Sequence, residues 1–142
     1  MQKEIKQTWF FSQSPSEVWE YLTKPELIEQ WLMKSDFRPI AGHKFRFTFV
    51  SKPEGKYDNV VHCEVLEVKP FTRLSYSWNG STQDKSRKYN STVVWTLVQK
   101  ANGTELQLQH DGFTVLEDIL THTSGWNSCV KKLEVQLNAI QK

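Results

Sequence analysis

The sequence has few of the features that mark secreted or membrane-spanning proteins. It contains two cysteines, Cys63 and Cys129, which are far apart and form no CxxC pair, whereas small secreted scaffolds are rich in disulfides. Its first residues are polar and lack the apolar segment of a signal peptide. No apolar run approaches the 18 or so residues of a membrane span. We therefore expect a cytoplasmic protein with reduced thiols and no membrane insertion.

The sequence also lacks a marked excess of one charge. Its 18 Lys and Arg and 16 Asp and Glu give a net charge of +2, and the signs are interspersed. Phosphate backbones are bound by concentrated basic surfaces, so a nucleic-acid partner is not expected. The densest basic cluster, Lys85, Arg87 and Lys88, lies in a polar stretch and is interpreted as a solvated loop. No Walker or GxGxxG pattern is present, and we expect no cofactor.

Metal ligands are equally scarce. The four histidines show no HxH or HxxxH spacing. His62 and Cys63 are neighbours in an expected strand, so their side chains point to opposite faces and cannot share an ion. We interpret the histidines as surface or packed residues and predict no metal site.

Catalytic constellations are weak as well, and we predict no catalytic residue. Cys129 lies on the apolar side of an expected helix, where a thiol is usually an inert small hydrophobe. A dyad with His110 stays open as an alternative. Glu64 and Glu67 would point to opposite faces of a regular strand unless a bulge intervenes, and solvated charges are the default interpretation.

What the sequence does have is aromatic side chains: six tryptophans, eight phenylalanines and four tyrosines. Each such ring can remove roughly 150–250 Å² from water. This supply is enough for a core and leaves aromatic surface to line a cavity.

Alternating and helical patterns predict the order of elements. Residues 3–11 are expected to form a strand, followed by two short helices that start with capping boxes, Ser14 with Glu17 and Thr23 with Glu26. A loop over 32–43 precedes strands at 45–50, 57–68, 74–78, 91–98 and 105–111, the last two joined by a hairpin at Asn102-Gly103. Residues 112–124 are expected to be a linker with one helical turn. Trp126 then opens a long helix with apolar residues three or four apart.

This order predicts an α+β fold in one domain, residues 1–142. One helix cannot cover both faces of six strands, so we expect a curved, six-stranded antiparallel sheet that wraps around the C-terminal helix. The outer face of the sheet would stay solvated.

A curved sheet around one helix tends to leave space between the two, which favours a ligand cavity over a solid core. Rings from both would line it, with a few polar groups to orient the ligand. The candidate ligand-binding residues are Phe45, Phe47, Phe49, Cys63, Tyr76, Trp78, Trp95, His110, Trp126, Cys129, Val130 and Leu133.

Several short motifs, in order, resemble the activator of heat shock protein ATPase homologue-like family of the START-like superfamily, which has the helix-grip fold. They are Ser14-Pro15-Ser16-Glu17-Val18-Trp19, Trp31, Gly42 with the Phe45/Phe47 strand, Val65 to Pro70, Leu74 to Trp78, Ser91 to Leu97, Gly103 to Leu106, His110 to Phe113, and His122 with Gly125-Trp126. The resemblance covers nearly the whole chain and implies the same fold as the pattern of elements.

For function the resemblance implies less. Related domains bind lipids, sterols, phenolics or polyketides between sheet and helix; a few are cyclases or aromatases; one branch is a co-chaperone, which links the family to the stress response. The favoured hypothesis is binding of a planar or polycyclic apolar molecule by a monomer or weak homodimer. The alternatives are a chaperone-associated interaction module and a cyclase-type enzyme, in which His110 or Glu64 would be the ionisable group.

Overall fold

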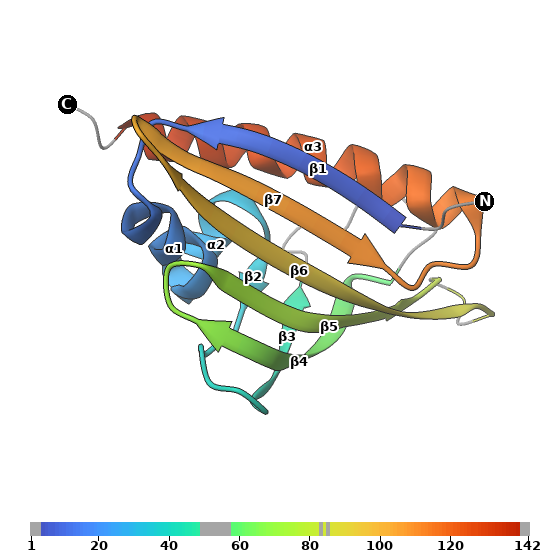
Figure 1. Cartoon of the computed structure of the whole chain (residues 1–142). Coiled ribbons are helices and arrows are strands. Elements are labelled where there is room, and N and C mark those ends of the chain that lie inside the picture. The colour runs from blue at the N-terminus through green and yellow to red at the C-terminus, as the bar shows by residue number, and fades with distance from the viewer. Residues whose placement is uncertain (1–3, 49–57, 83, 85, 140–142) are drawn as a thin grey trace.

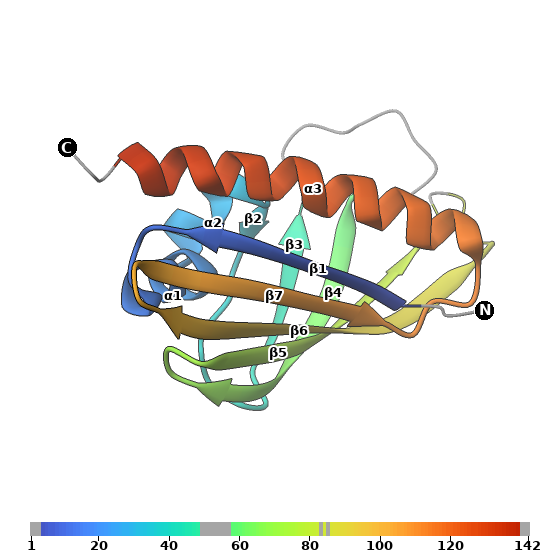
Figure 2. The same ribbon diagram turned by 45° about the horizontal axis from the view of Figure 1, so that its top comes forward.

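A computed structural model describes residues 4–48, 58–82, 84 and 86–139. Two residues named above, the candidate Phe49 and the basic Lys85, lie outside these ranges. Within them the chain forms a curled antiparallel sheet, with a long helix, α3, across one face and two short helices at one end (Figures 1 and 2). The expected α+β architecture is confirmed.

The sheet has seven strands in the described residues, not the six expected from the sequence. The additional strand is β2, Lys34–Ser35, which pairs with the end of β3. Two residues are too few to show a periodicity, so this part of the expected loop gave no strand signal. The order across the sheet is β1-β7-β6-β5-β4-β3-β2. The other strands are β1 (Glu4–Phe11), β3 (Lys44–Thr48), β4 (Val60–Lys69), β5 (Arg73–Ser81), β6 (Lys88–Lys100) and β7 (Gly103–Asp111).

The hairpin between β6 and β7 is confirmed, but its two turn residues are Ala101 and Asn102, one position before the expected Asn102-Gly103 pair. Gly103 follows at the start of β7, where a Cβ would collide with the carbonyl oxygen of Phe11 at the end of β1. A side chain there would force β1 away from β7. The glycine is therefore required by the close approach of two backbones.

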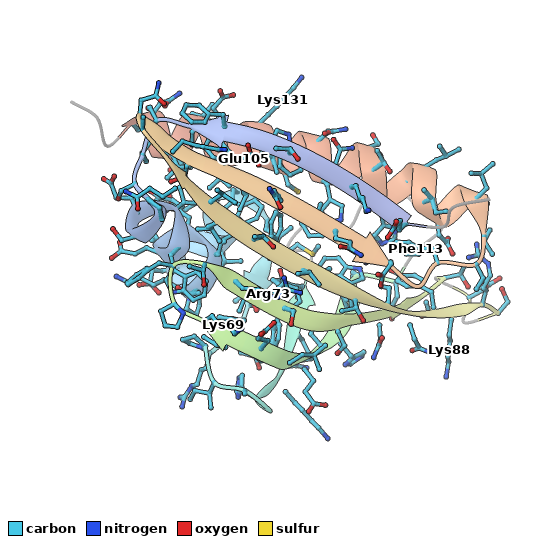
Figure 3. All side chains as sticks on the ribbon, in the orientation of Figure 1. Lys69, Arg73, Lys88, Glu105, Phe113 and Lys131 are labelled. Atoms are coloured by element: carbon cyan, nitrogen blue, oxygen red, sulfur yellow. The ribbon has the colours of Figure 1, made fainter. Side chains whose placement is uncertain are left out.

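A bulge in β4 settles the position of the two strand carboxylates. The register between β4 and β5 shifts between Val65 and Glu67, so Leu66 is an extra residue. Glu64 and Glu67 consequently share the outer face, where Glu67 pairs with Arg73 and Lys69. Figure 3 shows Arg73 among the polar side chains on the side of the sheet away from α3. Neither carboxylate faces the interior.

The two short helices, α1 (Pro15–Thr23) and α2 (Pro25–Trp31), begin as expected, but only one has the expected cap. The capping box of Ser14 and Glu17 is present at α1. The capping box expected at α2 is wrong: Lys24 is the N-cap, and its side chain makes no capping hydrogen bond. The hydroxyl of Thr23 instead donates to the carbonyl of Trp19, because Thr23 is still the last residue of α1.

Helix α3 (Leu116–Ala139) is longer than expected and includes most of the supposed linker. The expected start at Trp126 is wrong: α3 also runs through the threonine, serine and glycine residues before it, which are weaker helix formers. The buried side chains are spaced for one continuous face from Asp118 through Trp126, Val130 and Leu133 to Leu137. Because α3 starts earlier than expected, its first turns lie beside the C-terminal end of β5 and the N-terminal end of β6.

The capping box at α1 provides a direct stability test. Ser14→Ala removes the acceptor for the backbone N–H of Glu17 and should lower the free energy of unfolding by about 1 kcal/mol. Urea denaturation would measure this change. The matched control is Ser128→Ala, at an exposed position inside α3; a loss for Ser14→Ala no larger than for this control would contradict the assignment.

Candidate ligand-binding cavity

A cavity of about 170 Å³ lies between α3, the ends of β5 and β6, and the segment after α2, and it opens to solvent. Its wall is almost entirely apolar. Trp78, Tyr89 and Trp126 contribute three large rings from three different elements. The other lining residues are Leu32, Met33, Asp58, Val61, Thr121, His122, Gly125 and Cys129.

Three of the twelve candidate residues line this cavity: Trp78, Trp126 and Cys129. Cys129 is half-buried, and burial raises the pKa of its thiol, partly offset by the nearby charge of Lys132. Because a thiol with a raised pKa is mostly protonated at neutral pH, Cys129 is a poor nucleophile there. It contributes an apolar surface to the wall.

Three other candidates pack into a solid aromatic cluster beside the cavity. The ring of Phe45 lies 5.3 Å from that of Phe47 and 5.4 Å from that of Tyr76, with both pairs close to edge-to-face. Phe37, which the sequence argument did not single out, completes the cluster at 5.0 Å from Phe45. All four rings are buried in the hydrophobic core and none of them lines the cavity.

The remaining described candidates also belong to the core. Trp95 is fully buried, with its ring 6.0 Å from that of Trp31 and 5.3 Å from that of Trp126. Val130 and Leu133 are buried on the same helix face. Cys63 is buried on β4, where desolvation, and to a lesser degree the charge of Asp36, raises the pKa of its thiol.

His110 lies behind the cavity wall, fully buried, with both ring nitrogens occupied. The indole N–H of Trp126 donates to Nδ1 at 3.0 Å, so Nδ1 carries no proton. Nε2 lies 2.8 Å from the hydroxyl of Ser91, which itself donates to the carbonyl of Trp78. Nε2 is therefore the donor, and His110 is a neutral imidazole with its proton on Nε2.

His122 lines the cavity and is held in the opposite tautomer. Its Nδ1 lies 2.8 Å from the carbonyl oxygen of Asp118, which can only accept, so Nδ1 carries the proton. Its Nε2 accepts from the indole N–H of Trp78 at 3.3 Å. The indole N–H groups of both tryptophans in the cavity wall thus donate hydrogen bonds to histidine nitrogens.

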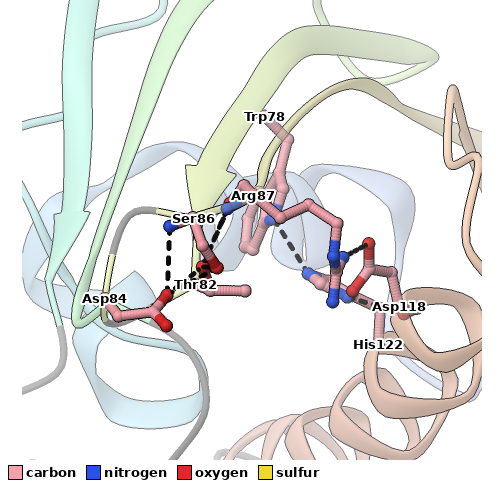
Figure 4. A network of polar contacts seen from close by, with 7 residues as sticks. All are labelled: Trp78, Thr82, Asp84, Ser86, Arg87, Asp118 and His122. Atoms are coloured by element: carbon pink, nitrogen blue, oxygen red, sulfur yellow. Dashed lines mark hydrogen bonds and ion pairs between the residues drawn. The ribbon is translucent and has the colours of Figure 1, made fainter.

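A network of polar contacts supports His122 from the surface side (Figure 4). The side chain of Asp118 is buried in the first turn of α3 and pairs with Arg87, which lies just before β6. Nearby, Asp84 accepts hydrogen bonds from the backbone and hydroxyl of Ser86 and from Thr82, and these lower its pKa to about 2. Arg87 is thus more than the solvated loop residue expected from the sequence.

The comparison with family models gives a match over residues 12–138, to the activator of Hsp90 ATPase homolog 1-like protein. This chain belongs to that family. The comparison with curated proteins gave no match.

Among solved structures, a protein from Mesorhizobium loti is 36% identical over 99% of both chains, with a TM-score of 0.86. CalU16 from Micromonospora echinospora is 24% identical, with 94% of this chain and 75% of that one covered and a TM-score of 0.71. DynU16, a protein of the dynemicin biosynthetic locus, is 22% identical, with 97% of this chain and 48% of that one covered and a TM-score of 0.78. The last two share the fold.

Sequence reasoning missed eight of the lining residues, among them His122 and Gly125. Both would have been found if the helical pattern had been followed upstream of Trp126, because positions 122, 125, 126 and 129 share one helix face. Tyr89, Val61 and Met33 gave no comparable signal, because their roles depend on where distant segments meet.

The described residues contain no group of three His, Cys, Asp or Glu side chains that could hold a metal ion. None of the helices in the same ranges is long and apolar enough to cross a membrane. His110 and Glu64 are the two ionisable groups considered for a cyclase. Neither of them presents to the cavity an atom that could accept a proton from a substrate. The first has both nitrogens occupied and the second lies on the outer face.

The buried pair of α3 gives a second test. Arg87→Ala removes a charged partner of the Asp118 side chain, which is 2% exposed. Because the Arg87 side chain is 32% exposed, water replaces part of the lost interaction, and we expect a loss of about 2 kcal/mol in unfolding free energy. The control is Lys88→Ala at the exposed neighbour, and equal losses for the two variants would contradict the role of the pair.

The two histidines predict how stability depends on pH. Desolvation lowers the pKa of both below 6.5; the charge of His122 adds to this for His110, whereas Asp118 partly offsets it for His122. The unfolded chain therefore binds more protons than the folded one as pH falls through about 6.5. Unfolding free energy should be fully maintained above that pH and should fall below it, with a slope approaching about 1.4 kcal/mol per pH unit for each histidine.

Denaturation at pH 7.5, 6.5 and 5.5 would measure this slope. His122→Gln should reduce it by the contribution of one group, whereas His62→Gln, on the exposed side of β4, should leave it unchanged. A slope that is the same in all three proteins would contradict the neutral, half-buried state of His122.

Proposed function

We propose that this protein binds a small apolar molecule in the cavity between α3 and the sheet. The observation that carries the proposal is the cavity wall itself, in which three aromatic rings from separate elements surround an open space of about 170 Å³. Aromatic side chains can also pack against one another without leaving a cavity, as Phe45, Phe47 and Tyr76 do. Concave, mostly apolar spaces of this kind are the usual sites for small molecules.

The size of the cavity limits the ligand. Pockets that bury a drug-sized molecule measure roughly 300–1,000 Å³, well above the volume present here. A sterol, flavonoid or polyketide would therefore place one ring-sized portion inside and leave the rest at the opening. This narrows the polycyclic ligand expected from the sequence to a molecule with an apolar end of about one ring.

Two alternatives have less support. A co-chaperone role needs a contiguous partner surface. Most of the exposed large apolar side chains are spread over β1, β4, α3 and the connecting segments, although Leu116 and Leu120 lie one turn apart on α3. A cyclase role needs an ionisable group with a free atom in the cavity, and His122 has both ring nitrogens hydrogen-bonded.

That DynU16 comes from a biosynthetic locus accords with a small-molecule ligand. We propose that binding takes place in the cytoplasm, where the two free thiols stay reduced.

The two cysteines provide an experiment with an internal control. Cys129 lines the cavity, whereas Cys63 is buried in the core away from it. A panel of flavonoids, sterols, fatty acids and polyketides is first screened by tryptophan fluorescence and thermal shift. A ligand that raises the unfolding temperature should then slow alkylation of Cys129 by iodoacetamide several-fold, as read by peptide mass spectrometry.

Cys63 should react slowly with or without the ligand, and any change there would report a change in overall stability. A ligand that stabilises the protein but leaves the Cys129 rate unchanged binds elsewhere, and the proposal fails. The proposal also fails if no compound of the panel stabilises the protein and none protects Cys129.

A further inference from the structure

We infer that the part of the ligand taken into the cavity is a neutral aromatic ring without hydrogen-bonding groups, and that Gly125 sets the size of that ring. This inference rests on the proposed function and assigns the ligand chemistry of the same cavity. It follows from the hydrogen bonds of the wall and from the space in front of one helix position.

The nitrogen atoms of the wall are already hydrogen-bonded to one another. Trp78 donates to His122 and Trp126 donates to His110, while the second nitrogen of each histidine bonds to Asp118 or Ser91. A hydroxyl or amine of a ligand placed against these rings would lose its bonds to water without gaining a partner. Burial of such an unpaired group is costly.

The oxygens of the lining are also poorly placed to receive a polar ligand inside the cavity. The Tyr89 hydroxyl lies against Gly80 of the neighbouring strand, where it is the atom closest to the position that a Cβ would take. Thr121 is exposed, so it lies at the rim. The carboxylate of Asp58 accepts a hydrogen bond from the backbone N–H of Asn59. Polar substituents are therefore tolerated only at the opening.

No contact within the fold requires glycine at position 125 of the cavity wall. It lies inside α3, where glycine is less favourable than alanine. A Cβ built on it meets no atom within 4 Å, so no neighbour demands the missing side chain. Gly125 lines the cavity and is itself exposed, so the open space in front of it lies at the opening, where a larger residue would narrow the entrance.

The volume and the wall together favour one aromatic ring. An apolar cavity of roughly 150 Å³ can hold benzene, so a cavity of similar size accepts one ring with a small substituent. The walls are themselves aromatic, and an inserted ring can meet them edge to face, as Trp95 and Trp126 meet at an interplanar angle of 89°. Such contacts favour an aromatic over a saturated ring of the same size.

The test is a titration calorimetry series with four probes: toluene, phenol, methylcyclohexane and benzoate. We expect toluene to bind at least tenfold more tightly than phenol, its near-isostere with a hydroxyl, and more tightly than methylcyclohexane. Benzoate should not bind. Equal affinities for toluene and phenol, or for toluene and methylcyclohexane, would overturn the inferred ligand class and leave the proposed function standing.

Variants of α3 then test the role of Gly125. Gly125→Ala should raise the unfolding temperature by about 2–5 °C, because alanine favours the helix, and should weaken toluene binding several-fold. Gly125→Leu should block the opening of the cavity and abolish binding in a folded protein. The matched control, Ser124→Ala, replaces an exposed neighbour that does not line the cavity and should leave toluene affinity unchanged.

The possible failures are distinguishable. Unchanged toluene affinity in Gly125→Leu would overturn the assignment of Gly125, because the ligand would then bind elsewhere. Equal losses in Gly125→Ala and Ser124→Ala would overturn it as well, since the effect would belong to the helix as a whole. If none of the probes or of the larger compounds binds the unmodified protein or protects Cys129, the proposed function itself fails.

Discussion

The cavity wall depends on one constraint: an indole N–H removed from water must find an acceptor. Trp78 and Trp126 face each other across the space between β5 and α3, with ring centroids 5.2 Å apart. Each donates to a histidine, and each histidine is held neutral by the bond that it accepts. If either imidazole were protonated on both nitrogens, it would repel the indole N–H and leave a donor unpaired in an apolar environment. Because the two histidines have opposite tautomers, the cavity wall presents aromatic surfaces, and each indole and imidazole nitrogen in it already has a hydrogen-bond partner.

The fold supplies this arrangement from segments that are distant in the chain. His110 comes from β7, next to Ser91 on β6, whereas His122 comes from the first turns of α3. The position of His122 depends on Asp118, which is anchored by Arg87 and offers its backbone carbonyl to Nδ1. Stability and site chemistry are linked here, because the pair that fixes the start of α3 also orients one ring of the cavity.

Patterns of adjacent residues predicted the fold well, since alternation and helical spacing report which side of an element is buried. The strands, the two short helices and the apolar face of α3 after Trp126 follow from such patterns. Two-residue β2 was too short to show one, and Gly125 hid the continuity of α3. The site was harder to predict. Phe45, Phe47 and Tyr76 had the same sequence signal as Trp78, yet only Trp78 borders space, because packing volume is decided by all neighbours together. Tyr89 and Met33 reach the cavity only through the meeting of separate elements.

The tautomers of His110 and His122 test this account most directly. Nitrogen-15 NMR of the imidazole rings at pH 7 distinguishes a protonated from an unprotonated ring nitrogen, and single His→Gln variants assign the signals. The account predicts that His110 carries its proton on Nε2 and His122 carries its proton on Nδ1, both neutral. A doubly protonated ring, or the same tautomer in both histidines, would mean that at least one indole N–H lacks its acceptor. The cavity wall would then present polar atoms to the ligand, and the account of an apolar aromatic site would be wrong.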